Sequence, residues 1–390
     1  MGVAQEGTSA PFGLLGPPGQ VVATHDHRDH ASDLHLDQIV SGITADREEA
    51  AAVEELFFHQ MRAVEVVRYR HDVFRDLDEP ETWAALKRFC ESIRAVLSHV
   101  SQARAMRVLE QRQGWVLDAA DIYIHAVRAL ANDLSETRLG SRGLLDFRGY
   151  LGGHVSSEEF ARLEADTVAC KVALAGIAYC VNIDGGRVTV TRYAEEPDYS
   201  EEIHSVFERF RQGAVRSYLA QYRVWPGMTY VSQQILGLVV RLFPEQFTLL
   251  GTFSDRHGSF FDPGVHLFYR ELQFYMSYRE IADSIRNDGL DFCYPEVDAE
   301  RKDESAEDTF DLALAMKLHT EEGDVITNDL RLGAGERIFV VSGPNQGGKT
   351  TFARTFGQLH HLAAIGVPVP GRSARLYLCD RIFTHFEREE

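Results

Sequence analysis

The clearest chemistry in the sequence lies in one run near its C-terminal end, Gly343-Pro344-Asn345-Gln346-Gly347-Gly348-Lys349-Thr350. The run satisfies the pattern G-x-x-x-x-G-K-[ST], which binds nucleotide phosphates. Its glycines let backbone N–H groups curl round a phosphate without Cβ clashes. In such a loop Lys349 reaches the β- and γ-phosphates, and the Thr350 hydroxyl ligates Mg²⁺. The motif, with Thr351 after it, therefore predicts a site for ATP and Mg²⁺.

Local elements must position this loop. Residues 338–341 are apolar and are expected to form a strand that leads into it. Phe352, Phe356, Leu359 and Leu362 lie on one face of an expected helix that leads out. Such a helix directs its positive end at the same phosphates. The order strand, loop, helix favours a true phosphate site over a chance glycine-rich turn.

Upstream of the loop, apolar spacings of three and four predict mostly helices. One helix is expected through Val53 to Val67, a second over 81–99, and a third opened by a capping box of Ser156 and Glu159. A long helix is expected from Asp262-Pro263 to about Gly289. Two β-rich runs flank Asp184-Gly185-Gly186 and predict a hairpin, and 326–332 and 337–342 are expected as further strands.

These elements predict a mainly α fold followed by an incomplete α/β phosphate-loop domain. Four regions are expected: a flexible His/Asp-rich tail over 1–35, a helical core with lever and clamp over 36–295, a charged linker over 296–308, and the first part of an ATPase domain over 309–390. The linker prediction depends on the stretch EVDAERKDESAED, which is charged and nearly free of large apolar residues.

Composition limits the class of protein. A formal net charge of −19 and a pI near 5.3 argue against wholesale electrostatic binding to nucleic acid, although a local basic groove stays compatible with them. The five cysteines have no CxxC spacing, which favours a reducing compartment over a disulfide framework. The sequence shows no signal peptide and no run of 18 apolar residues. A soluble, cytoplasmic protein is expected.

The amino-acid sequence of the loop resembles that of the MutS family. GPNQGGKTT is similar to the loop of that family, and residues 365–370 and 380–384 (IGVPVP and DRIFT) are similar to the stretches that follow it. Upstream, 268–295 resembles the helix that returns to the family's ATPase domain, and 69–77 the start of its helical core. The resemblance is strong after residue 262 and covers about 36–390. It implies an ATP-dependent, DNA-binding protein of mismatch repair or recombination, in which ATP binding moves the helical levers and the clamp on DNA.

Three departures from the family modify that expectation. His385 stands where the family usually has Arg. The family's Walker B aspartate and glutamate are expected beyond Glu390, so no catalytic residue is assigned within this chain, which looks truncated and is expected to bind ATP without its catalytic carboxylates. About 35 residues precede the helical core, so an N-terminal mismatch-reading domain is not expected. The resemblance implies a homodimer for the full-length protein.

A local basic island stands out in the acidic chain. Arg209, Arg211, Arg216 and Arg223 are interleaved with aromatic residues over 203–225. They lie where a MutS-like protein would place its DNA clamp, and arginines there could hold phosphates without reading sequence. A solvated arginine face over an aromatic core explains the same pattern and is slightly favoured.

A rival motif lies near the N-terminus. Thr24-His25-Asp26-His27-Arg28-Asp29-His30 matches T-H-x-H-x-D-H, which binds two zinc ions in metallo-β-lactamase-like hydrolases. That fold needs strands before the motif and βα units after it, whereas helices follow here. The alternatives to a MutS-type protein are therefore a non-catalytic interaction protein with a vestigial loop and, less favoured, a metallo-hydrolase that uses His25 to His30.

Overall fold

The computed structural model describes residues 11–18, 24–26, 28–45, 49–184, 187–194, 230–344 and 347–386. Helices dominate these residues and the sheets are small, which confirms the mainly α prediction. The chain divides into two compact units. The first unit takes residues 1–91, 127–156 and 262–390, and the second takes 92–126 and 157–261. Two helices, α4 (Pro80–Ala105) and α5 (Leu109–Glu136), have residues in both units.

The first unit is built on α11 (Pro263–Asn287), which lies close to its predicted bounds. The carboxylate of Asp262 accepts the backbone N–H of Val265 at 2.8 Å, and Pro263 occupies the first helical position, so both start signals act as expected. Residues 272–278 are all buried, so other parts of the unit cover this stretch on every side. The other helices of this unit are α1 (Leu36–Thr44), α2 (Ala50–Phe58), α3 (Val64–Asp78), α6 (Arg142–Val155), α12 (Leu312–Glu321) and α13 (Lys349–Ala364).

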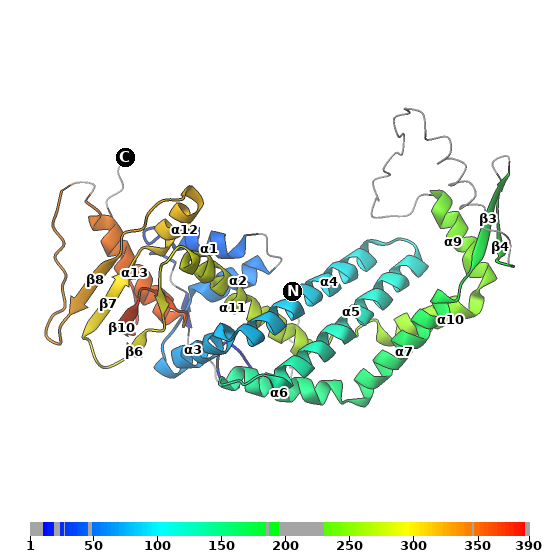
Figure 1. Cartoon of the computed structure of the whole chain (residues 1–390), viewed down its shortest axis with the longest axis horizontal. Helices are drawn as coiled ribbons and strands as arrows, with labels where there is room; N and C mark the ends of the chain where they lie inside the picture. Colours follow the sequence, from blue (N-terminus) through cyan, green and yellow to red (C-terminus); the bar gives the residue numbers. More distant parts are fainter. Residues whose placement is uncertain are drawn as a thin grey trace, which may run out of the picture. The chain divides into compact units, whose positions relative to one another are not determined.

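A four-stranded sheet packs beside α13 in this unit (Figure 1). Its order is β6-β10-β7-β8, from β6 (Glu296–Asp298), β10 (Ser373–Tyr377), β7 (Glu304–Thr309) and β8 (Asn328–Leu332). Strand β10 is parallel to β6 and antiparallel to β7, and β7 is antiparallel to β8. Two smaller pairs accompany it: β1 (Thr24–Asp26) with β2 (His59–Met61), and β5 (Phe292–Cys293) with β9 (Val369–Pro370).

The linker expected over 296–308 is instead part of this sheet, because it supplies β6 and β7. The apolar residues of the stretch are few but well placed, and Val297 and Ala306 are buried. Its charged side chains find partners across the strands: Arg375 bonds to Glu296 at 2.9 Å and to Asp303 at 3.4 Å. Charge density alone therefore gave a misleading signal for a linker.

The single helix expected through Val53 to Val67 is wrong. Helix α2 ends at Phe58, the chain then forms β2, and α3 begins at Val64. Strand β2 pairs antiparallel with β1, so backbone hydrogen bonds to a segment more than 30 residues away replace the helical ones. Val53, Phe57, Met61 and Val67 are nevertheless buried as the spacing predicted.

Residues 11–18, part of the expected tail, pack into the first unit. Phe12 and Leu14 are buried, and the Phe12 ring lies 5.1 Å from that of Phe147. Polar side chains hold the backbone of this segment: Tyr69 Oη donates to the Gly13 carbonyl at 2.7 Å, and Leu14 N donates to Glu271 at 2.6 Å. We call residues 12–15 the strap.

The second unit contains α7 (Glu158–Ala175), α9 (Tyr230–Leu242), α10 (Pro244–His257) and the hairpin of β3 (Tyr179–Asp184) with β4 (Arg187–Arg192). The antiparallel pairing of β3 with β4 confirms the predicted hairpin, whose Gly185 and Gly186 lie outside the described residues. Helix α7 starts one residue later than expected, because Ser157 rather than Ser156 accepts the capping bond, from Phe160 N. Helix α10 packs on α7, and His257 bonds to Asp166 at 2.8 Å.

Within the described ranges, no single helix has the length and apolar composition to cross a bilayer. The bent pair formed by Val231–Leu242 and Pro244–His257 meets that test by length and composition only.

Candidate functional site

Helix α13 begins directly behind the glycine-rich motif. Its first residue is Lys349, and Gly348 before it has the positive φ of 78°. A residue with a side chain is strained in that conformation, so glycine is the natural choice. The Phe352 N–H already bonds to the Gly348 carbonyl at 2.9 Å, whereas the earlier N–H groups of the helix have no carbonyl of the helix to accept them. Those groups and the helix dipole favour an anion at this end.

The two glycines before Lys349 shape the space in front of the helix. A Cβ at Gly348 would meet no atom within 4 Å, so that side of the loop is open. A Cβ at Gly347 would lie 3.0 Å from the Pro344 carbonyl oxygen, which is too close for an unstrained side chain. The Gly347 N–H bonds to the same carbonyl at 3.2 Å and closes a turn. The motif therefore forms a tight turn with an open, anion-favouring mouth.

The motif's cation points at this turn. Lys349 Nζ donates to the carbonyl oxygens of Gly343 and Pro344 at 2.8 and 2.7 Å. Thr350 is exposed at the start of α13, and Thr351 is half-buried. The structure thus brings together the described motif residues Gly343, Pro344, Gly347, Gly348, Lys349, Thr350 and Thr351; Asn345 and Gln346 lie outside the described residues.

These groups fit a nucleotide polyphosphate with its magnesium ion. The donor set consists of backbone N–H groups at a helix start and one lysine ammonium, which suits phosphate oxygens. An exposed hydroxyl on the next residue is a hard oxygen ligand of the type Mg²⁺ prefers. Lys349 and the loop N–H groups would hold the phosphates, and Thr350 would hold the magnesium ion. The nucleotide would supply a phosphoanhydride bond, and Mg²⁺ would neutralise part of the phosphate charge.

Polar contacts buried behind the loop fix the position of α13. Asp311 accepts Arg354 Nη1 at 2.9 Å and Gln358 Nε2 at 2.8 Å, and it also caps α12 through Leu314 N at 3.1 Å. The side chain of Asp311 is fully buried. A carboxylate that joins two helices in this way holds the start of α13 in one orientation.

The expected strand over 338–341 does not pair with any strand among the described residues. The segment does alternate as a strand would: the Phe339 ring packs 5.5 Å from that of Phe356, while Ile338 and Val340 are 80% and 89% exposed. A strand needs a neighbouring backbone to satisfy its N–H and C=O groups. The strand prediction is therefore wrong for this segment: Phe339 packs against α13, but the segment has no sheet partner in the described part of the chain.

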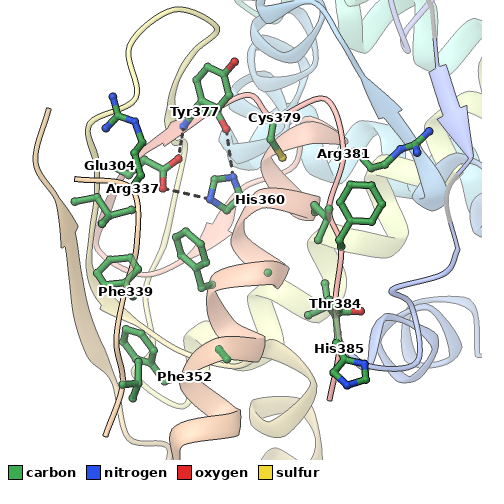
Figure 2. Close-up of a pocket in the computed structure, with 18 of the residues that line it drawn as sticks. Glu304, Arg337, Phe339, Phe352, His360, Tyr377, Cys379, Arg381, Thr384 and His385 are labelled. Atoms are coloured by element: carbon green, nitrogen blue, oxygen red, sulfur yellow. Dashed lines mark hydrogen bonds and ion pairs between the residues drawn. The ribbon is translucent and has the colours of Figure 1, made fainter. Parts of the chain in front are cut away.

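A cavity of about 700 Å³ opens beside α13 (Figure 2). It lies between the segment that carries Arg337 and Phe339 and the segment that follows β10 and carries Cys379 to His385. Glu304 and His360 also line it. Glu304 lies on β7 and Cys379 follows β10, far apart in the sequence, so no local pattern could indicate that these residues meet.

The remaining predicted sites have different outcomes. Arg209, Arg211, Arg216 and Arg223 lie outside the described residues. In the THDHRDH motif, Thr24–Asp26 form β1, and the His30 imidazole lies 3.4 Å from that of His361. Among the side chains that the structure describes, no three His, Cys, Asp or Glu residues group closely enough to hold a metal ion.

The structure thus describes a mainly helical chain with a glycine-rich G-x-x-x-x-G-K-[ST] motif at the start of a helix. No family model matches the chain. Parts of it are similar to proteins named DNA mismatch repair protein MutS. That of Thermosynechococcus vestitus is 45% identical over 62 residues, which are 16% of this chain and 7% of the relative.

Two further relatives of that name show the same pattern. The protein of Synechococcus sp. strain WH7803 is 51% identical over 57 residues, or 15% of this chain and 6% of the relative. That of Parasynechococcus marenigrum is 29% identical over 162 residues, or 36% of this chain and 18% of the relative. The chain therefore spans less than a fifth of the length of these relatives, and the similarity to MutS is partial.

Proposed function

We propose that this chain is a nucleotide-binding, DNA-binding protein of the MutS type that acts in mismatch repair or recombination. The observation that carries the proposal is the motif geometry: Lys349 and an open glycine turn stand at the start of α13. The partial similarity to proteins named for mismatch repair supports the same function.

The contacts of α13 suggest how nucleotide binding would reach the rest of the first unit. Asp311 links the helix to α12. At the other end of α13, Arg70 of α3 donates to the Ile365 carbonyl at 2.7 Å and to the Leu15 carbonyl of the strap at 2.9 Å. A shift of α13 would therefore strain contacts to α12, α3 and the strap together. On this proposal ATP binding biases these contacts and, through the helices, the levers and clamp on DNA.

Lys349 itself has a definite part in this proposal. Its ammonium bonds to two carbonyl oxygens of its own loop. A phosphate oxygen is a better partner for an ammonium than a neutral carbonyl, because the hydrogen bond is then charge-assisted on both sides. We infer that Lys349 keeps the loop closed on itself and turns toward phosphate when nucleotide binds.

The test is Mg·ATP binding by the 390-residue chain, measured by calorimetry with and without duplex or branched DNA. Lys349→Ala is expected to weaken binding by at least about tenfold, because a charged hydrogen-bonding group contributes roughly 1.5–3 kcal/mol. Lys317→Ala is the matched control, since Lys317 lies on the surface of α12 with its side chain 65% exposed; its affinity should be unchanged.

Each result has a clear meaning. Binding that depends on Lys349 and changes DNA affinity supports a nucleotide switch of the MutS type. A folded chain that binds no nucleotide, or whose Lys349→Ala variant binds as well as Lys317→Ala, would reject the proposal. The chain would then be better explained as a non-catalytic interaction protein with a vestigial loop.

A further inference from the structure

A second chemically active cluster lies away from the motif, in the cavity beside α13. Glu304, His360 and Cys379 all line this cavity (Figure 2). His360 Nε2 lies 3.4 Å from a carboxylate oxygen of Glu304, and Nδ1 lies 3.2 Å from the Tyr377 carbonyl oxygen. Cys379 lies beside His360 in the same cavity (Figure 2). A thiol, an imidazole and a carboxylate thus meet in one cavity.

The surroundings of His360 favour its charged form. Burial opposes the charge, but the contacts with Cys379 and Glu304 outweigh burial and raise the pKa of His360 to about 10. Both ring nitrogens face acceptors, which suits a ring that carries a proton on each. The charged ring therefore adds to the positive charge of the cavity that Cys379 lines.

The cavity itself indicates the kind of molecule that would reach this sulfur. Its volume of about 700 Å³ is in the range of small-molecule sites. Its lining is rich in cationic and aromatic side chains, which include Lys302, Arg337, Arg381, Phe339, Phe352 and Phe356. Glu304 is the carboxylate of the lining, and His385 is a further titratable group. Reactive cysteines occur in such electropositive, partly exposed surroundings, and Cys379 is half-exposed.

We propose that Cys379 is a modification site that exchanges with small anionic aromatic disulfides entering this cavity. The Cys379 thiol loses its proton to solvent, and its sulfur attacks one sulfur of the disulfide. A mixed disulfide forms as the S–S bond of the reagent breaks, and the other half leaves as an aromatic thiolate. The reagent is reduced and Cys379 is oxidised, so no other oxidant is needed; His360 keeps its proton throughout.

The other cysteines give an internal comparison. Burial raises the pKa of Cys293 to about 11 and also raises that of Cys170, so both are poor nucleophiles near neutral pH. Cys90 is buried. Cys180, half-exposed on the β3–β4 hairpin, is therefore the comparator for Cys379.

The experiment exposes the 390-residue chain briefly to 5,5′-dithiobis(2-nitrobenzoate) at pH 7 and maps the labelled cysteines by mass spectrometry. Cys379 is expected to react about tenfold faster than Cys180, and Cys379→Ser should remove the fast phase. The double variant Lys302→Ala/Arg337→Ala should slow this anionic reagent by about threefold or more. It should leave the rate with the neutral reagent 2,2′-dipyridyl disulfide unchanged.

A further variant separates the imidazole from the cavity charge. His360→Gln should slow both reagents, with the fold checked by circular dichroism. If this variant does not fold, the double variant still decides, because Lys302 and Arg337 are exposed. The proposal is overturned if Cys379 reacts no faster than Cys180, if the double variant affects both reagents equally or neither, or if a folded His360→Gln variant keeps the fast rate.

Discussion

At the scale of single residues, Asp311 is the side chain on which the position of α13 depends most. It bonds to Arg354 and Gln358 of α13 and caps α12, all from a fully buried position. Removing one partner of a buried pair leaves an uncompensated charge, which costs about 3–5 kcal/mol. We expect Asp311→Ala to lower the free energy of unfolding by about that amount in urea titrations.

A control separates this effect from ordinary charge removal. Asp72 pairs with Arg75 on the surface, with both side chains about half exposed. Exposed pairs of this kind contribute under about 1 kcal/mol, so Asp72→Ala should change stability little. Equal losses in the two variants would show that Asp311 does not act as a buried link between α12 and α13.

His361 gives the chain a pH dependence on its acid side. Its ring is fully buried: Nε2–H donates to the Phe57 carbonyl at 2.9 Å, and Nδ1 accepts from Gln60 at 2.9 Å. Burial, followed by the nearby His30, lowers its pKa from 6.5 to about 3. The folded state therefore binds fewer protons than the unfolded state between these values. The contribution of the neutral His361 ring to the free energy of unfolding is fully present above pH 6.5 and is lost as the pH falls toward 3.

The slope for one such group is up to about 1.4 kcal/mol per pH unit, so chemical unfolding at pH 7, 6 and 5 should show a clear decline. Burial lowers the pKa of His71 to about 3 as well, so it adds to the same decline. His361→Gln should make the acid limb shallower than in the unsubstituted chain. His125→Gln, at a site that is 78% exposed, is the control and should leave the slope unchanged.

At the scale of elements, the segment over 337–341 packs one aromatic side chain against α13 but has no strand partner among the residues that the structure describes. Phe339 packs against Phe352 and Phe356, whereas Val340 on the opposite side is 89% exposed. We expect Phe339→Ala to cost about 1–2 kcal/mol in thermal or urea unfolding, less than a fully buried Phe because the ring is half-buried. Val340→Thr should stay within about 0.5 kcal/mol.

The same segment predicts a difference in association. Exposed apolar strands with free backbone edges pair with other chains. Val340→Thr should therefore reduce concentration-dependent self-association in sedimentation experiments, whereas Phe339→Ala should not reduce it. If Val340→Thr leaves self-association unchanged, this segment is not the surface through which copies of the chain associate.

Local signals in the sequence predicted the elements whose determinants are themselves local. The β3–β4 hairpin and the start of α11 depend on neighbouring residues, and both predictions were correct. The break of the helix at His59–Met61 depends on pairing with β1, and the strap depends on a slot made by α3 and α11. Contacts between residues distant in the sequence do not change the hydrophobic periodicity. The spacing of Val53 and Phe57 is the same whether the helix continues past Phe58 or ends there.

The candidate site divides in the same way. Lys349 and its glycines follow from a contiguous motif, and the structure brings the described ones together. The cluster of Glu304, His360 and Cys379 joins β7, α13 and the end of β10, so only tertiary structure reveals it. Asp311, which positions α13, lay in the sequence as an ordinary acid before an apolar run, and a capping residue was the most that its position could have indicated.

At the scale of the whole molecule, net charge determines which kind of surface could bind DNA. The net charge of −19 opposes a polyanion, so binding must depend on a local basic surface. The proposed surface is Arg209, Arg211, Arg216 and Arg223, which lie outside the described residues. Each phosphate contact contributes about −0.9 to the slope of log K against log salt. Replacing all four with Ala should make that slope shallower by about 3 to 4 and weaken binding at low salt.

A matched variant keeps the change in net charge the same. Arg62, Arg138, Arg142 and Arg331 are exposed arginines elsewhere in the chain, and replacing those four with Ala removes an equal number of charges. If the first variant alone flattens the salt dependence in fluorescence titrations with duplex DNA, a localised contact holds the phosphates. If both variants flatten it equally, the chain responds only to total charge, and residues 203–225 are better explained as a solvated arginine face over aromatic residues.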